Sequence, residues 1–161
     1  MFSIRRYETS DYQAVWDLHN LALHHIGAHV GNGEWDDDLH NIDTVYSQNG
    51  GEFLVRTEDD VIIAMGALKR TSDTHAEIKR MRVHPDHQKR GLGQFLLSAL
   101  EEAALTLGYK VLELRTTTIQ KAAQILYERN GYTITGRSEL APFVVITYQK
   151  VLSGQADIEE V

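Results

Sequence analysis

The stretch from residue 75 to residue 116 constrains the fold of this chain more than any other part of its sequence. Apolar residues follow a strand-like pattern in 75–83, a helical period in 92–107 and a strand-like run again in 111–116. Two strands that are joined through one helix lie parallel in the same sheet. The sequence therefore predicts a βαβ unit whose two strands are parallel neighbours.

Around this unit the sequence predicts an α/β fold of the mixed α+β type. Strand-like runs at 53–55 and 61–68 are separated from one another and from 75–83 by short polar turns, which favours antiparallel pairing. The sheet should therefore be mostly antiparallel, with a central parallel strand pair joined by a crossover helix. Further elements are expected as helices at 11–26, 36–49 and 120–129 and as strands at 133–137 and 143–150.

The strand at 75–83 contains a break in its alternation. Ala76 and Ile78 place apolar side chains at even positions, whereas Met81 and Val83 place them at odd ones. Because side chains alternate faces with a period of two, a regular strand cannot send both pairs to one face. One extra residue near Lys79-Arg80, a β-bulge, would restore a common apolar face. A strand buried on both faces would explain the same pattern, so both interpretations stay open.

Size, charge and composition exclude several classes of protein. The 161 residues suit a single domain, expected over residues 1–152, with an acidic, disordered tail at 153–161. Sixteen Lys and Arg against 23 Asp and Glu give a net charge of −7, which argues against a nucleic-acid or membrane partner. The absence of cysteine excludes disulfides, thiolate metal sites and a cysteine nucleophile, and fits a reducing compartment. No apolar signal segment follows the first residues, so the expected location is cytoplasmic.

A basic, glycine-containing loop leads directly into the predicted helix at 92–107. Gly91 and Gly93 let the main chain turn tightly and approach a ligand. Consecutive amides at a helix N-terminus form an anion site, and Lys89 and Arg90 add two positive charges there. The loop matches neither the Walker A pattern nor the dinucleotide fingerprint, which would need a third glycine at Leu96. Taken alone, the loop therefore fits either an anion site, where a diphosphate would lie, or only a turn.

The segment Gln88-Lys89-Arg90-Gly91-Leu92-Gly93 resembles the Q/R-x-x-G-x-G/A signature of the GNAT superfamily of acyl-CoA-dependent N-acyltransferases. A second segment, residues 123–132, is similar to another conserved stretch of that family, and the order of elements fits over about residues 1–150. The resemblance implies that acetyl-CoA is the co-substrate, and no metal is expected.

The resemblance also implies which residues hold the cofactor. Amides of the loop would bind the pyrophosphate, and the main chain of the bulged strand would pair with the pantetheine arm as an added strand would. The family commonly has an Asn at the start of the last helix, where this chain has Gln120, or Thr117 or Thr118 as substitutes. The expected cofactor-binding residues are Met81, Arg82, Val83, Gln88, Lys89, Arg90, Gly91, Leu92, Gly93, Gln120 and Ala123.

Two residues are candidates for the proton transfers of acyl transfer. Glu77 matches a glutamate that is the general base in some family members, which is useful because a lysine-like amine has a pKa near 10.4. A rim carboxylate paired with Lys79 or with a neighbouring strand is the other interpretation. Tyr127 stands where the family has a tyrosine general acid for the thiolate, although its place on an apolar stripe equally suits packing in the core.

The remaining polar candidates carry weaker signals. Glu34, Trp35 and Asp36 lie in the N-terminal region that borders the acceptor site in this family, where acid would attract a cationic amine. A capped helix start and a solvated loop explain the same residues. The histidines at 24, 25 and 29 lack the carboxylate that would complete a metal site.

The expected function is therefore transfer of an acetyl group from acetyl-CoA to a primary amine, by direct attack in a ternary complex. The acceptor, a small molecule or a peptide, is left open by the sequence, and a homodimer is expected only because the family often dimerises. A non-catalytic acyl-CoA sensor is the first alternative. A protein that binds nucleotide phosphates is the second.

Overall fold

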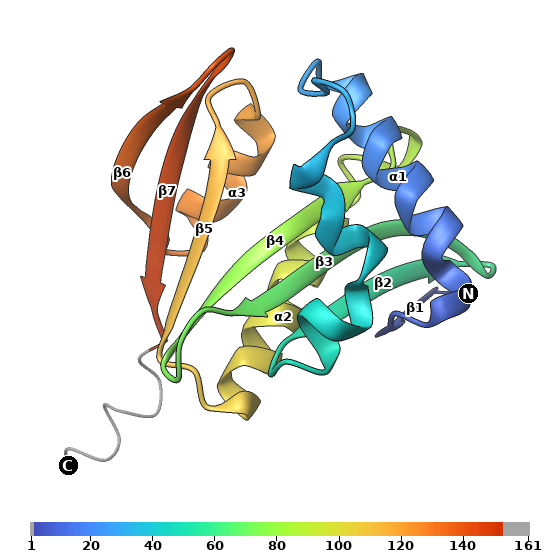
Figure 1. The fold of residues 1–161 in the computed structure, drawn as a ribbon, viewed down its shortest axis with the longest axis horizontal. Coiled ribbons are helices and arrows are strands. Elements are labelled where there is room, and N and C mark those ends of the chain that lie inside the picture. The colour runs from blue at the N-terminus through green and yellow to red at the C-terminus, as the bar shows by residue number, and fades with distance from the viewer. Residues whose placement is uncertain (1, 153–161) are drawn as a thin grey trace.

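The computed structural model describes residues 2–152, so the predicted tail at 153–161 lies outside the described residues. Its strands are β1 (Phe2–Arg6), β2 (Glu52–Glu58), β3 (Val61–Arg70), β4 (His75–Val83), β5 (Val111–Thr117), β6 (Thr133–Leu140) and β7 (Phe143–Val151). They form one sheet in the order β1-β2-β3-β4-β5-β7-β6 (Figure 1). Within the described residues, β4 and β5 are parallel and all other neighbours are antiparallel. The predicted mixed, mostly antiparallel sheet is confirmed.

Three α-helices cover the two faces of the sheet: α1 (Tyr12–His25), α2 (Leu92–Leu107) and α3 (Lys121–Arg129). Helix α2 connects β4 to β5, as the crossover predicts, and its fully buried Leu96, Leu97 and Leu100 pack with α3 on one face. Val15 and Leu18 of α1 pack on the opposite face. Burial of each such leucine stabilises the fold by about 1.5–3 kcal/mol.

The helix predicted at 36–49 is wrong as a single element. The chain instead forms two short helices, η2 (Glu34–His40) and η3 (Asp43–Ser47). Asn41 lies between them with φ −141° and ψ 43°, a conformation that no helix can continue through. Apolar spacing predicted the buried faces of this stretch, which include Leu39, Ile42 and Tyr46, but it could not indicate the break.

The predicted β-bulge in β4 is confirmed. Met65 of β3 faces Arg82, and two residues later Ala67 faces Lys79, so β4 uses one residue more than β3 over this interval. Arg80 takes up the extra residue with a left-handed φ of 59°. Opposite the bulge lies Gly66.

Strands β4 and β5 pair only at their beginnings. The register runs from His75–Val111 to Ile78–Leu114, although β4 continues to Val83 and β5 to Thr117. Each strand stays paired with its other neighbour, so the sheet divides past Ile78 and the two strands separate (Figure 1). The bulge, a known cause of strand bending, lies where the separation begins. The β5-facing main-chain groups of 79–83 are thereby left outside the ladder.

Candidate active site

The loop before α2 exposes main-chain N–H groups at the end of the separated strand. After β4 the chain passes through a short helix, η4 (Pro85–His87), and Gly91 then begins α2 with φ 77°. None of the loop hydrogen bonds within residues 2–152 uses the main-chain N–H of Gln88, Lys89 or Gly91. These amides and the unpaired first turn of α2 present the donors that an anion needs.

The two basic side chains of this loop lie in different surroundings. Lys89 is exposed, with a left-handed φ of 65°. Arg90 donates from Nη1 to Glu58 Oε2 on β2 at 3.0 Å, and the hydrogen bond from Arg90 lowers the pKa of that carboxyl. Arg90 is therefore tied to the end of β2, although both side chains are exposed to solvent.

Close packing of α2 on α3 depends on Gly93. A Cβ at this position would lie 3.3 Å from Leu126 Cδ2, which is tighter than ordinary contact. At the start of α3, Gln120 donates from Nε2 to Thr117 Oγ1 at 2.9 Å. Two of the three residues that could replace the family's Asn are therefore hydrogen-bonded to each other. Thr118 accepts at its carbonyl from Gln124, and Ala123 is half-buried in the first turn.

Tyr127 of α3 packs in the core, as one of its two interpretations expects. Its ring is 5% exposed and packs 5.9 Å from the ring of Tyr132 and 6.1 Å from that of Tyr148, centroid to centroid. Its hydroxyl, however, makes no hydrogen bond to any residue that the structure describes. Burial raises the pKa of Tyr127 to about 12, against the opposing charge of Arg82. The phenol is therefore protonated at neutral pH and has its proton free to donate.

Glu77 of β4 lies at the closed end of the strand pair, in register with Glu113. Its side chain is 13% exposed, and its Oε2 accepts a hydrogen bond from Arg115 Nη1 on β5 at 3.0 Å. This is the neighbouring-strand contact that the rim interpretation expects, although the partner is Arg115 and not Lys79. Oε1 has no hydrogen-bond partner among residues 2–152 and is the oxygen left to accept a proton.

A buried pair between α1 and η2 was not predicted from the sequence. His19 is 1% exposed and Asp36 is 2% exposed, and His19 Nε2 lies 2.9 Å from Asp36 Oδ1. Burial, followed by the charges of Arg82 and Arg80, lowers the pKa of His19 to about 4, so the ring is neutral. With Nε2–H assigned as donor to Asp36, Nδ1 accepts from Arg82 Nε at 3.4 Å. The available sequence signal was a histidine among the apolar positions of α1.

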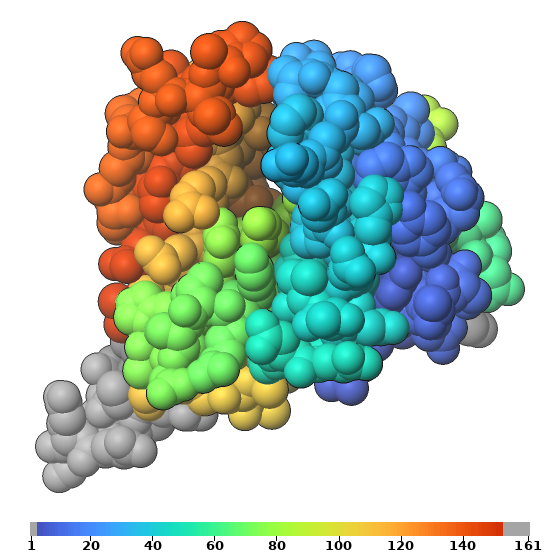
Figure 2. All heavy atoms as spheres, viewed as in Figure 1, coloured from blue at the N-terminus to red at the C-terminus, as the bar shows by residue number. Residues whose placement is uncertain are grey.

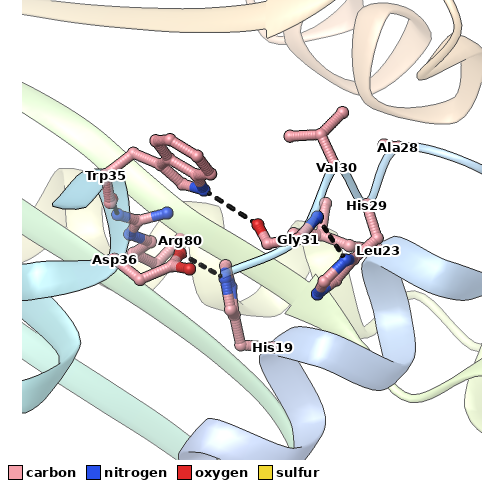
Figure 3. A pocket seen from close by; sticks show the side chains of 9 residues that line it. All are labelled: His19, Leu23, Ala28, His29, Val30, Gly31, Trp35, Asp36 and Arg80. Atoms are coloured by element: carbon pink, nitrogen blue, oxygen red, sulfur yellow. Dashed lines mark hydrogen bonds and ion pairs between the residues drawn. The ribbon is translucent and has the colours of Figure 1, made fainter. Parts of the chain in front are cut away.

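Of the three residues predicted for the acceptor site, two line a pocket. Its volume is about 80 Å³, and its walls are His19, Leu23, Ala28, His29, Val30, Gly31, Trp35, Asp36 and Arg80. In Figure 3, Trp35 lies over the pocket and its Nε1–H points to the carbonyl of Gly31, at 3.2 Å. Glu34 is exposed and does not line it.

The acidic side chains of this segment are already paired. Asp36 accepts from Asn32 Nδ2 at 2.9 Å in addition to His19. Burial alone would raise the pKa of Asp36, but the hydrogen bond from Asn32 and the interaction with His19 outweigh it and lower the pKa. Asp38 is held by Arg80 from the bulge. Asp38 is therefore neutralised by Arg80, whereas Asp36 keeps its negative charge, because the His19 ring and the Asn32 amide that hold it are neutral.

The surface is hollowed beside these residues. Figure 2 shows a depression between the light-blue residues near 30 and the orange C-terminal strands. Within residues 2–152, no three His, Asp or Glu side chains gather in a way that could hold a metal ion. No helix in the same range is long and apolar enough to cross a membrane.

Comparisons with known proteins agree with this geometry. The family model described as Acetyltransferase (GNAT) family matches residues 7–132. A probable N-acetyltransferase 14 of Xenopus tropicalis is 35% identical over 101 residues, which are 62% of this chain and 49% of that protein. The chain spans about half the length of several curated relatives that it matches.

Two further similarities extend over most of the chain. The L-amino acid N-acyltransferase MnaT of Escherichia coli (strain K12) is 27% identical over 145 residues, covering 84% of this chain and 81% of MnaT. The structure of yncA from Salmonella typhimurium, solved with acetyl-CoA, has a TM-score of 0.77 at 23% identity and covers 94% of each chain. At that identity the structural similarity shows the shared fold.

Proposed function

The chain belongs to the acetyltransferase (GNAT) family, and we propose that it transfers an acetyl group from acetyl-CoA to a primary amine by direct attack in a ternary complex. The observation that carries this proposal is the separation of β4 from β5 past Ile78, between an anion-binding loop at one end and the unpartnered hydroxyl of Tyr127. An extended thioester needs a slot of this kind with an anion site at its mouth.

The residues of the separated strand and loop suit the cofactor. The amides of 88–93 would hold the diphosphate, and the β5-facing main-chain groups of 81–83 would pair with the pantetheine amides. Lys89, exposed beside the loop, would add a charge contact. The bound group would supply an acetyl carbon activated by a thioester.

We assign the proton transfers to two side chains of this chain. Glu77 takes a proton from the acceptor ammonium through water. We assign this role to Oε1, because Arg115 holds Oε2. The neutral amine then attacks the acetyl carbon and forms the C–N bond. As the C–S bond breaks, Tyr127 donates its phenolic proton to the sulfur, and the second proton of the attacking nitrogen, lost as the amide forms, returns to the phenolate through water.

Release of free thiol from acetyl-CoA, measured across a panel of amines, tests this proposal. The panel should include amino acids, peptides with free N-termini, polyamines and aminoglycosides. Thiol release with at least one amine, together with the acetylated product in a mass spectrum, would support the enzyme. Tight binding of CoA in calorimetry without thiol release for any acceptor would favour the non-catalytic sensor.

A further inference from the structure

We propose that Arg82 binds a carboxylate of the acceptor, so that the preferred substrates are amino acids and not amines that lack a carboxylate. This inference rests on the proposed function, because it names the acceptor of the same reaction. Only the main chain of Arg82 was expected to contact the cofactor, and the inference adds a binding role for its side chain.

The guanidinium of Arg82 has no carboxylate partner. Its Nε donates to the neutral ring of His19 at 3.4 Å, and its Nη1 donates to the carbonyl of Met81 at 3.0 Å. No Asp or Glu oxygen within residues 2–152 lies within 4.0 Å of its nitrogens, and its Nη2 has no partner there. A guanidinium has five N–H donors in a fork that matches a carboxylate. Arg82 therefore keeps unused donors for an anion.

Its neighbour Arg80, in contrast, has hydrogen-bond acceptors for its guanidinium, including a carboxylate. Arg80 donates to both oxygens of Asp38, at 2.5 and 2.9 Å, and to the carbonyl of Trp35. Asp36 and Asp38 lie in the same short segment, but of the two arginines only Arg80 forms an ion pair with one of them. The fold thus gives Arg80 a structural role and leaves Arg82 without a carboxylate in contact among residues 2–152.

The surroundings of Arg82 hold its side chain in place without neutralising it. His19 is fixed by Asp36, which is itself fixed by Asn32, so the acceptor atom for Arg82 Nε cannot move freely. Burial and the charge of Arg80 lower the pKa of Arg82 to about 10, which still leaves it charged at neutral pH. Placing an anion beside such a cation removes much of the cost of burying it.

Arg82 and Tyr127 both lie beside the separated part of β4. Arg82 follows Ile78, where the pairing with β5 ends, and Met81 and Val83 on either side of it pack against the buried cluster that contains Tyr127. Under the proposed function the attacking amine must lie at the thioester sulfur beside the hydroxyl of Tyr127. A carboxylate on Arg82 then belongs to the same acceptor as the amine. An amino acid meets this requirement, whereas a polyamine would place a second cation against Arg82.

The test compares each amino acid with its own amide, because the pair differs only in the carboxylate. We expect kcat/KM for thiol release to be at least tenfold higher for the acid, although the amide has the more readily neutralised amine. Arg82→Met should lower the ratio of kcat/KM for the acid to kcat/KM for the amide by about 10- to 100-fold, the range for hydrogen bonds to a charged group. Arg82→Lys should recover part of the loss.

Arg137→Met, at an exposed position on β6, is the matched control and should leave both substrates unaffected. Melting temperature and CoA affinity of each variant show whether it is folded. Equal kcat/KM for acids and amides in the unmodified protein, with amines still acetylated, would overturn the inference and leave the proposed function standing.

A binding measurement makes the inference independent of turnover. Calorimetry in the presence of CoA should show binding of at least one amino acid and at least tenfold weaker binding of its amide, with the difference lost in Arg82→Met. If no amine releases thiol, the proposed enzymatic function is wrong, and this binding measurement still tests whether Arg82 binds a carboxylate. Equal binding of acids and amides, or binding of neither, would overturn the inference.

Discussion

Arg80 and Asp38, which are 42 residues apart in the chain, form a two-pronged ion pair that joins the bulge of β4 to η2. The Arg80 Nη2–Asp38 Oδ1 distance is 2.5 Å, the Nε–Oδ2 distance is 2.9 Å, and both side chains are 12% exposed. The extra residue that bends β4 is thus also the residue that attaches the N-terminal segment to the sheet. One contact fixes two walls of the candidate site relative to each other.

Arg80→Met should therefore destabilise the protein markedly. Removal of one partner leaves the Asp38 carboxylate half-enclosed with Tyr46 as its remaining donor, and the cost of breaking a buried pair is about 3–5 kcal/mol. Urea unfolding measures this loss. The double variant Arg80→Met/Asp38→Asn should recover part of it, because no unpaired charge remains. Equal stability of the two variants would contradict this account.

The buried His19 should make stability fall as the pH drops from about 6.5 to about 4. The unfolded chain binds a proton on this ring in that window, whereas the folded pKa of about 4 keeps it neutral, so acid favours unfolding. The loss amounts to about 2–3 kcal/mol at the acid end. The unfolding free energy of both His19→Gln and the unmodified protein should be measured at pH 7 and at pH 4.5. The decrease between the two pH values should be smaller in His19→Gln. An equal decrease would mean that other groups dominate.

Tyr127→Phe should remove catalysis without removing the fold. The hydroxyl makes no hydrogen bond to the described residues, so its loss should leave urea stability and CoA affinity nearly unchanged, while kcat falls about 100-fold. Because burial raises the pKa of Tyr127 to about 12, its ionisation should cause no fall in kcat between pH 8 and pH 10.

Tyr132→Phe is the control for ring packing in the same cluster. That hydroxyl donates to Glu101 at 2.8 Å, so its removal should cost about 1 kcal/mol of stability and leave kcat unchanged. An unchanged kcat in Tyr127→Phe would leave Tyr127 as a packing residue.

Glu77→Gln should lower kcat/KM about 100-fold at neutral pH, if the carboxylate accepts the proton of the ammonium. The deficit should shrink as the pH rises toward the pKa of the amine, because neutral acceptor then forms without a base. Glu113→Gln, in register on β5, is the matched control. Similar rates for the two variants would instead support the rim interpretation, with Glu77 needed only to hold Arg115.

Gly66→Ala should destabilise the bulge from the opposite strand. A Cβ there would lie 2.6 Å from Met81 Sδ and 2.9 Å from Leu100 Cδ1, and Leu100 is fully buried and cannot move aside. Overpacking of this kind costs about 1–3 kcal/mol. Gly136→Ala on β6, where a Cβ meets no atom within 4 Å, should change stability by less than about 0.5 kcal/mol. Equal effects in urea unfolding would mean that the bulge tolerates extra volume.

The sequence by itself predicted the crossover, the loop before α2 and, as one of two interpretations, the bulge. Each of these follows from local spacing: the change of hydrophobic period, the parity slip between Ile78 and Met81, and the glycines at 91 and 93. Alternation and helical period are properties of neighbouring residues, so they can be read from the chain directly.

Only the tertiary structure decided which charged side chains have a hydrogen-bond or ion-pair partner and which do not. Asp36 and Asp38 appear as free acids in the sequence, but Asp36 is held by a hydrogen bond with His19 and Asp38 is paired with Arg80, while Arg82 receives no carboxylate among the described residues. Glu77 likewise finds Arg115 across the sheet. The strength of an ion pair depends on distances between residues far apart in the chain, which no local period encodes.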